Sequence, residues 1–143
     1  MTAVKLFAVR DTRAIELPCH VRTDGEVVVA EAGAQVPFVI ARLFTLQAPL
    51  GAVRGEHAHR RCAQFMLCVS GAVDIACADG REERVFSLDR GNLALLVPPT
   101  IWNTVTVRKD NSVLAVLCDR PYEAHDYIRD FGQFVAFREA PHS

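Results

Sequence analysis

Hydrophobic and polar positions along this chain form short runs that tend to alternate, and helical periodicity is almost absent. The runs are rich in Val, Ile, Leu and Phe, and turn-forming residues separate them, which is typical of β-strands. Ser70-Gly71 and Asp79-Gly80 are predicted hairpin turns, because Gly tolerates the positive φ that such turns need. The predicted strands cover residues 4–9, 26–30, 38–47, 64–69, 72–76, 84–88, 93–97, 102–107 and 113–118.

About nine short strands at this spacing predict an all-β sandwich or barrel, most simply a jelly roll. Residues 122–137 are the exception, because their acidic and aromatic residues fit a short helix or turn that leads into a terminal strand. We see no linker and no internal repeat, and 143 residues are enough for one domain, 1–143. With 50% hydrophobic and 23% charged residues, the chain can build an ordinary globular core.

Charge and the first residues exclude several classes of protein. A net charge of −1 gives no basic field, so neither nucleic acid nor an anionic membrane is an expected partner. The first residues lack the apolar region of a signal peptide, and no apolar stretch approaches the roughly 18 residues of a spanning helix. The expected location is the cytoplasm.

Five cysteines without a C-x-x-C pair argue against a disulfide framework and against a zinc knuckle. Most are expected to be small buried hydrophobic residues. Cys62 lies in the histidine segment and is a candidate nucleophile by position, but its sequence context favours a structural role.

The run Gly51-x5-His57-x-His59-x4-Gln64-x6-Gly71 resembles a cupin metal-binding motif in which one ligand has changed. Cupins usually have a glutamate at the Gln64 position and a further histidine at or near the Asn103 position. Transition-metal sites need three or four N, S or carboxylate donors, and a neutral amide replaces a carboxylate poorly. The resemblance therefore predicts a cupin jelly roll with no metal and no other cofactor.

Two histidines at positions i and i+2 of a strand point to the same face of the sheet. His57 and His59 should therefore project together into whatever the sheet encloses, and Arg61 shares their parity if the strand continues. Two imidazoles are suited to acid/base chemistry near pH 7 without a metal. His20, His125 and His142 have no such context and are expected on the surface.

A more specific resemblance rests on four segments. They are Val53-Arg54-Gly55-Glu56-His57-Ala58-His59, Gln64-Phe65-Met66-Leu67-Cys68-Val69-Ser70-Gly71, Pro98-Pro99-Thr100-Ile101-Trp102 and Asp126-Tyr127-Ile128-Arg129-Asp130-Phe131. They resemble the sugar 3,4-ketoisomerases, cupin enzymes of bacterial surface-sugar synthesis that act on nucleotide-linked 4-keto-6-deoxyhexoses. The resemblance implies an isomerase that moves a ketone from C4 to C3. Its implied substrate is a dTDP-linked sugar of deoxyamino-sugar biosynthesis.

The resemblance also implies roles for single residues. His57 and His59 are the expected acid/base pair, with the identity of the C3 base left open. Arg42 and Arg54 are candidates for binding the diphosphate, whereas Arg60 and Arg61 fit either that role or a solvated strand end. Gln64 and Asn103 should hydrogen-bond sugar oxygens. Trp102 is expected either to wall the site or to belong to the core.

The chain departs from the family at Arg42-Leu43-Phe44-Thr45, where relatives have a tyrosine-rich sequence. A tyrosine hydroxyl that serves the substrate there is therefore missing. Asn103 stands at a position that varies among relatives, so the C4 configuration of the product stays open.

Two other functions compete with the isomerase. A cupin that has lost its metal could bind a nucleotide sugar without turnover, although both histidines are retained. A metal-dependent cupin or a sugar epimerase is the remaining alternative. The family resemblance further implies a homodimer, in which the apolar residues 1–10 are suited to pairing with a neighbouring chain.

Overall fold

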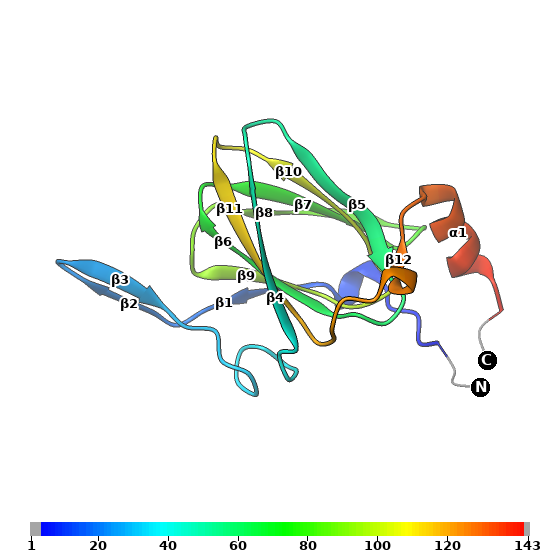
Figure 1. The fold of residues 1–143 in the computed structure, drawn as a ribbon, viewed down its shortest axis with the longest axis horizontal. Helices are drawn as coiled ribbons and strands as arrows, with labels where there is room; N and C mark the ends of the chain where they lie inside the picture. Colours follow the sequence, from blue (N-terminus) through cyan, green and yellow to red (C-terminus); the bar gives the residue numbers. More distant parts are fainter. Residues whose placement is uncertain (1–3, 142–143) are drawn as a thin grey trace.

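Two antiparallel five-stranded sheets face each other in the computed structural model, which describes residues 4–141 (Figure 1). The first sheet has the order β1 (Arg13–Glu16), β9 (Leu93–Val97), β6 (Gln64–Ser70), β11 (Ser112–Cys118) and β4 (Arg42–Ala48). The second has the order β12 (Tyr127–Ile128), β5 (Val53–His59), β10 (Trp102–Val107), β7 (Val73–Ala78) and β8 (Glu83–Leu88). The predicted all-β jelly-roll sandwich is confirmed.

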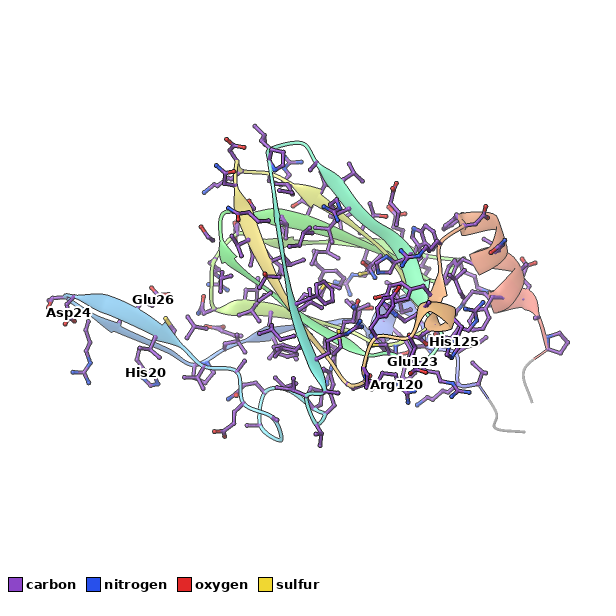
Figure 2. The ribbon with its side chains drawn as sticks, in the orientation of Figure 1. His20, Asp24, Glu26, Arg120, Glu123 and His125 are labelled. Atoms are coloured by element: carbon purple, nitrogen blue, oxygen red, sulfur yellow. The ribbon has the colours of Figure 1, made fainter. Side chains whose placement is uncertain are left out.

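A further sheet of two strands, β2 (Cys19–Arg22) and β3 (Gly25–Val28), forms a hairpin that projects from the two larger sheets (Figure 1). Figure 2 shows His20, Asp24 and Glu26 on this hairpin, away from the body of the molecule. Both strands are largely exposed. Residues 4–141 also contain three short helices, η1 (Val9–Asp11), η2 (Ala124–Asp126) and α1 (Phe131–Glu139).

Alternation along the strands divides the apolar residues between the inside and the outside of the sandwich. In β11 every second residue is buried, from Ser112 to Cys118, and these side chains belong to the interior. In β6 both faces are largely buried: Met66 and Cys68 belong to the core between the sheets, while Phe65 packs in a second cluster with Leu17 and Val36. A third cluster lies under α1, where Ala58, Ile128 and Phe134 are buried together.

The observed strands agree with the predicted ones through most of the middle of the chain and differ mainly at its ends. No strand forms in residues 4–8, and Val9–Asp11 is a 3-10 helix, so the predicted strand at 4–9 is wrong for the described chain. Strands β1, β2 and β5 lie outside the predicted ranges, although β5 is the strand that was expected to carry His57 and His59. Strands β1 and β2 have only four residues each, and their side chains are mostly exposed. The short helix that leads into a terminal strand is confirmed, since η2 runs directly into β12, the last strand, whereas helix α1 after it was not predicted.

The two predicted turns have different outcomes. Asp79-Gly80 does connect a hairpin, because β7 and β8 pair along their whole length and Asp79 Oδ1 accepts hydrogen bonds from the amides of Arg81 and Glu82. Ser70-Gly71 instead carries the chain from β6 in one sheet to β7 in the other, so that prediction was wrong. A turn sequence fixes a local reversal, but not whether the two strands beside it pair.

Helix α1 begins at an N-cap, because the Asp130 side chain accepts a hydrogen bond of 2.9 Å from the amide of Gln133. It packs beside β12 and the end of β5, at one end of the second sheet (Figure 1). No helix in residues 4–141 has the length and apolar character needed to span a membrane.

Candidate active site

A cavity of about 190 Å³ lies between the two sheets. Alternation explains the lining from β6, β10 and β11, which contribute inward-facing residues two positions apart, such as Gln64 and Met66 on β6 and Leu114 and Val116 on β11. Its lining consists of Phe44, Thr45, Leu46, Arg54, Gly55, His57, Gln64, Met66, Asn103, Val105, Leu114 and Val116. The predicted site residues Arg54, His57, Gln64 and Asn103 are thus brought together at one cavity.

A β-bulge in β5 precedes the first histidine. Asn103 of β10 lies opposite His57 and Thr104 lies opposite Gly55, so Glu56 is an extra residue between them. Gly55 and Glu56 have φ angles of 79° and 54°. A Cβ atom at Gly55 would lie 3.1 Å from both the carbonyl oxygen and Oδ1 of Asn103. The glycine of the R-G-x-H-A-H motif is therefore needed for its backbone angle and for the space that Asn103 occupies.

The bulge also sets the tautomer of His57. The Nδ1 atom of His57 lies 3.0 Å from the carbonyl oxygen of Gly55, and because a carbonyl only accepts, Nδ1 carries the hydrogen. Nε2 is then an unprotonated nitrogen with a free lone pair. Burial, with a further contribution from the neighbouring His59, lowers the pKa of His57 to about 4. The ring is therefore neutral at neutral pH and able to accept a proton.

His59 forms a buried pair with Asp126 of η2. Its Nδ1 atom lies 2.8 Å from Oδ2 of Asp126, and the two residues are 3% and 5% exposed. A carboxylate on one ring nitrogen fixes the tautomer and leaves the other nitrogen for proton transfer. The backbone at this end of β5 is also held, since the amide of Thr100 donates a 2.6 Å hydrogen bond to the carbonyl oxygen of His59.

Asp126 is ionised by its hydrogen bonds rather than by exposure. Burial alone would raise its pKa, but hydrogen bonds from His59 and from the amide of Arg61 outweigh burial and lower the pKa. Ion pairs of Glu123 with Arg120 and His125, at 3.6 and 3.4 Å, hold the segment that carries Asp126, and these three residues lie close together in Figure 2.

The two imidazoles lie side by side, as alternation predicts. Their ring centroids are 5.0 Å apart with the planes at 84°. The ring of Tyr127 on β12 contacts both, at 5.1 Å from His57 and 4.3 Å from His59, and the guanidinium of Arg129 lies over the Tyr127 ring at 4.3 Å. Tyr127 therefore closes one side of the histidine pair.

Several buried polar atoms at this site have no hydrogen-bond partner among the described residues. They are Nε of Arg42, Nε2 of His59, Oε1 of Gln64 and Nδ2 of Asn103. Gln64 and Asn103 are each 2% exposed, and both line the cavity. Leaving a buried polar group unpaired destabilises the fold by about 1–3 kcal/mol, so such a cluster indicates groups that a ligand satisfies.

Three predicted site residues, Arg42, His59 and Trp102, are not among the residues that line the cavity, although Arg42 and His59 lie beside it. Arg42 donates from Nη2 to Sγ of Cys118 at 3.5 Å, and a further hydrogen bond joins its side chain to Tyr127. Trp102 occupies the opposite face of β10 from Asn103, under α1, where its ring lies 5.2 Å from Phe131 and 5.6 Å from Phe134. Of the two roles expected for Trp102, the structure thus agrees with a packed indole and not with a wall of the cavity.

The remaining predicted residues occupy the surface or the core. Arg60 and Arg61 are exposed, and β5 ends at His59, so the parity of the histidines does not extend to Arg61. Arg60 donates to the carbonyl oxygens of His125 and Tyr127. His20 and His125 are exposed as predicted, and His142 lies outside the described residues. Cys62 is 2% exposed and its pKa is raised, first by its interaction with Cys118 and then by burial, which agrees with the structural role.

One group of side chains has the composition of a metal site. Ligand atoms of His59, Cys62 and Asp126 lie within 4.8 Å of one another. The donor set fits a metal poorly, because Nδ1 of His59 already donates to Asp126 and the raised pKa keeps the thiol of Cys62 protonated, whereas metals bind thiolates. Gln64 and Asn103 add only amides.

The sequence placed Asp126 and Tyr127 in a family motif but indicated no role for either residue beside the histidines. Nothing in the spacing indicates that residues 126 and 127 contact residue 59, since that contact depends on the pairing of β12 with β5. Cys118 was treated with the other buried cysteines, yet it is a hydrogen-bond partner of Gln64 and Arg42.

Comparison with known proteins agrees with this geometry. A family model described as FdtA, WxcM-like, C-terminal matches residues 10–139. The TDP-4-oxo-6-deoxy-alpha-D-glucose-3,4-oxoisomerase of Aneurinibacillus thermoaerophilus is 29% identical over 114 residues, which are 79% of this chain and 82% of that protein.

Two solved structures have the same fold. QdtA, a sugar 3,4-ketoisomerase from Thermoanaerobacterium thermosaccharolyticum in complex with TDP, has a TM-score of 0.87 at 23% identity, with 92% of this chain and 96% of that chain covered. The WlaRB TDP-quinovose 3,4-ketoisomerase from Campylobacter jejuni has a TM-score of 0.84 at 26% identity, with 90% and 99% covered. The family of dTDP-sugar 3,4-ketoisomerases, which are isomerases, is the one that the sequence motifs resemble. The chain therefore belongs to this family, described as WxcM-like, C-terminal.

Proposed function

We propose that this protein is a sugar 3,4-ketoisomerase that converts TDP-4-keto-6-deoxyglucose, or a close relative of it, into the 3-keto isomer by metal-free acid/base catalysis. The observation that carries the proposal is the neutral His57 beside the His59–Asp126 pair at a cavity with unpartnered polar groups. Family membership and the substrate of the Aneurinibacillus enzyme support it.

The reaction requires four proton movements. The hydrogen on C3 is acidified by the neighbouring C4 ketone, so a base can remove it and give an enediol. The hydrogen on C3 must leave and one must be added at C4, while O4 gains a proton and O3 loses one. One group near the carbons and another near the oxygens can together complete this exchange without a redox cofactor.

His57 is suited to the carbon atoms. It lines the cavity, its Nε2 lone pair is free because Nδ1 donates to Gly55, and its lowered pKa keeps it unprotonated. When it takes the C3 proton, the negative charge that develops on the enediolate stabilises the imidazolium. The same nitrogen can then return the proton to C4.

The His59–Asp126 pair is suited to the oxygen atoms. Nδ1 of His59 is fixed on the carboxylate at 2.8 Å, so Nε2, which has no partner among the described residues, can exchange a proton with O3 and O4. The ionised Asp126 stabilises the positive charge that the ring carries as a proton donor.

Recognition of the sugar nucleotide then falls to the remaining residues at the cavity. Oε1 of Gln64 and Nδ2 of Asn103 offer an acceptor and a donor for sugar oxygens. Arg54 lines the cavity and is exposed, as a diphosphate ligand needs to be. Phe44 and Thr45 line the cavity where relatives have tyrosine, so β4 supplies no phenol hydroxyl to the substrate.

The test is incubation of the purified protein with dTDP-4-keto-6-deoxyglucose, followed by NMR of the product. The expected result is a 3-keto sugar, whose C4 configuration is read from the same spectrum and whose ketone an aminotransferase of deoxyamino-sugar biosynthesis would use. Tight binding without turnover would replace the proposal by a nucleotide-sugar binding module.

Two variants test the division of work between the histidines. His57→Asn and His59→Asn should each lower turnover by about 10²- to 10⁴-fold, the usual contribution of a positioned general acid or base. In D2O, His57→Asn should lose exchange of the C3 hydrogen, whereas His59→Asn should retain exchange while forming little product. The opposite pattern would reverse the two roles, and near-normal rates in both variants would remove the histidines from the mechanism.

A further inference from the structure

Cys118 lies in a row of three side chains that cross the first sheet. In the register of the sheet, Cys118 of β11 pairs with Gln64 of β6 on one side and with Arg42 of β4 on the other. Cys118 shares the parity of Leu114 and Val116, which line the cavity, so its side chain faces the interior, where it is 0% exposed. The row thus joins two predicted substrate-binding residues through a sulfur atom.

The sulfur of Cys118 is surrounded by hydrogen-bond donors. Nε2 of Gln64 lies 3.7 Å from it and Nη2 of Arg42 lies 3.5 Å from it. The thiol of Cys62 also interacts with this sulfur, while its hydrogen bond of 3.4 Å goes to the carbonyl oxygen of Ala63. These donors lower the pKa of Cys118, with the contribution of Cys62 the largest, while Cys62 keeps its own proton. Sγ of Cys118 is therefore an acceptor.

This acceptor decides which end of the Gln64 amide faces the cavity. A carboxamide has a donor end and an acceptor end of nearly equal size, and either can point to a ligand. With Nε2 held on the sulfur, Oε1 is the free end, and Oε1 is buried without a partner among the described residues. Gln64 lines the cavity, so the free oxygen is available there to a hydroxyl donor.

We propose that Cys118 is a positioning residue whose sulfur holds the amide nitrogen of Gln64 and so presents the carbonyl oxygen of Gln64 to a hydroxyl group of the substrate. Arg42 completes the arrangement, because its guanidinium beside the sulfur favours the acceptor state. That the hydroxyl belongs to a keto sugar rests on the proposed function; the orientation of the amide does not.

The structural part is tested by 15N NMR of the Gln64 side-chain amide in the full-length protein. Its signal is identified by its disappearance in Gln64→Glu. In Cys118→Ala the signal should shift and its hydrogens should exchange with solvent faster, because Nε2 has lost its acceptor. In Cys118→Ser, which retains an acceptor at this position, both properties should stay closer to those of the wild type.

Cys68→Ala is the matched control. Cys68 is also a buried cysteine of the core, 1% exposed, but its sulfur donates to the carbonyl oxygen of Ser70 and contacts neither Gln64 nor Arg42 through a hydrogen bond. An unchanged Gln64 signal in Cys118→Ala, or an equal change in Cys68→Ala, would overturn the proposal. Thermal unfolding of each variant shows that the comparison is made on folded protein.

The functional part is tested by steady-state kinetics on the keto-sugar nucleotide. Cys118→Ala should lower kcat/KM by about 10-fold, the usual effect of one misplaced hydrogen bond, mainly through a higher KM. Cys118→Ser should recover most of the loss. If Cys118→Ala keeps the wild-type KM although its amide signal has moved, Gln64 does not contact the substrate and the functional part is refuted. If the wild-type protein turns over no keto sugar, the proposed function fails, whereas the NMR comparison still decides the role of Cys118.

Discussion

Replacing Asp126 by Asn removes one charge from the buried pair with His59 and keeps the size of the side chain. In the native protein both carboxylate oxygens are used, Oδ2 by Nδ1 of His59 at 2.8 Å and Oδ1 by the amide of Arg61 at 2.7 Å. An amide has only one acceptor oxygen. If this oxygen keeps the bond with Arg61, the NH2 group faces Nδ1 of His59, and that nitrogen must then become the acceptor.

The expected losses follow from these two bonds. A hydrogen bond to an ionised group contributes about 1.5–3 kcal/mol, so Asp126→Asn should lower the free energy of unfolding by about that amount near neutral pH. His59 is forced into the other tautomer, with the hydrogen on Nε2. The equivalent change in the serine protease triad lowers kcat by about 10⁴-fold, and we expect a fall of about 10²- to 10⁴-fold here.

The stability difference should also depend on pH. The pKa of Asp126 is lowered in the folded protein, so its contribution is present above the unfolded value near 3.8 and is lost as the pH falls through the lower folded value. Urea unfolding of the wild type and of Asp126→Asn at pH 7 and below pH 4 measures this. The two curves should lie apart at pH 7 and approach each other in acid.

Asp24→Asn is a suitable control, because Asp24 is exposed in the turn of the projecting hairpin, far from the cavity (Figure 2). It removes the same charge from the chain and should change neither turnover nor stability by more than about 0.5 kcal/mol. Asp126→Asn with wild-type kcat would refute the reasoning, since His59 would then work without its carboxylate. So would an equal stability loss in both variants.

Four further outcomes are expected. Gly55→Ala should destabilise the protein by more than Gly51→Ala and raise KM, because both glycines have positive φ but only at Gly55 would the new Cβ press on Asn103; urea unfolding and kinetics compare them. The pKa of about 4 for His57 predicts that kcat/KM persists down to about that pH, and an acid limb above pH 6 would contradict this. Purified protein should contain no stoichiometric transition metal by elemental analysis and should keep its activity in EDTA, whereas chelator-sensitive activity would count against the acid/base scheme. Sedimentation at micromolar concentration should give a homodimer, because sheet edges and the exposed Val21 and Val27 of the hairpin need cover, and a monomer would remove this expectation.

The sequence by itself determined the fold class and the common orientation of the two histidines in the candidate site. Alternating short strands require two faces, one of which must be buried, and this is sufficient to predict a sandwich or barrel. Period-two alternation is a local property of a strand, so it also placed His57 and His59 on one face, and the structure brings their rings within 5.0 Å. The weak patterns of β1 and β2 were missed, because short exposed strands bury too little to leave a signal.

Tertiary structure decided what surrounds the histidines. The partner of His59 is 67 residues away along the chain, and it arrives there only because β12 pairs with the end of β5. Asn103 and Trp102 are neighbours in sequence but lie on opposite faces of β10. Only the face with Asn103 lines the cavity, and the tertiary structure decided which face that is. The row of Gln64, Cys118 and Arg42 depends on the register of three strands. Register is set by the packing of the whole sheet, so no local pattern of residues contains it.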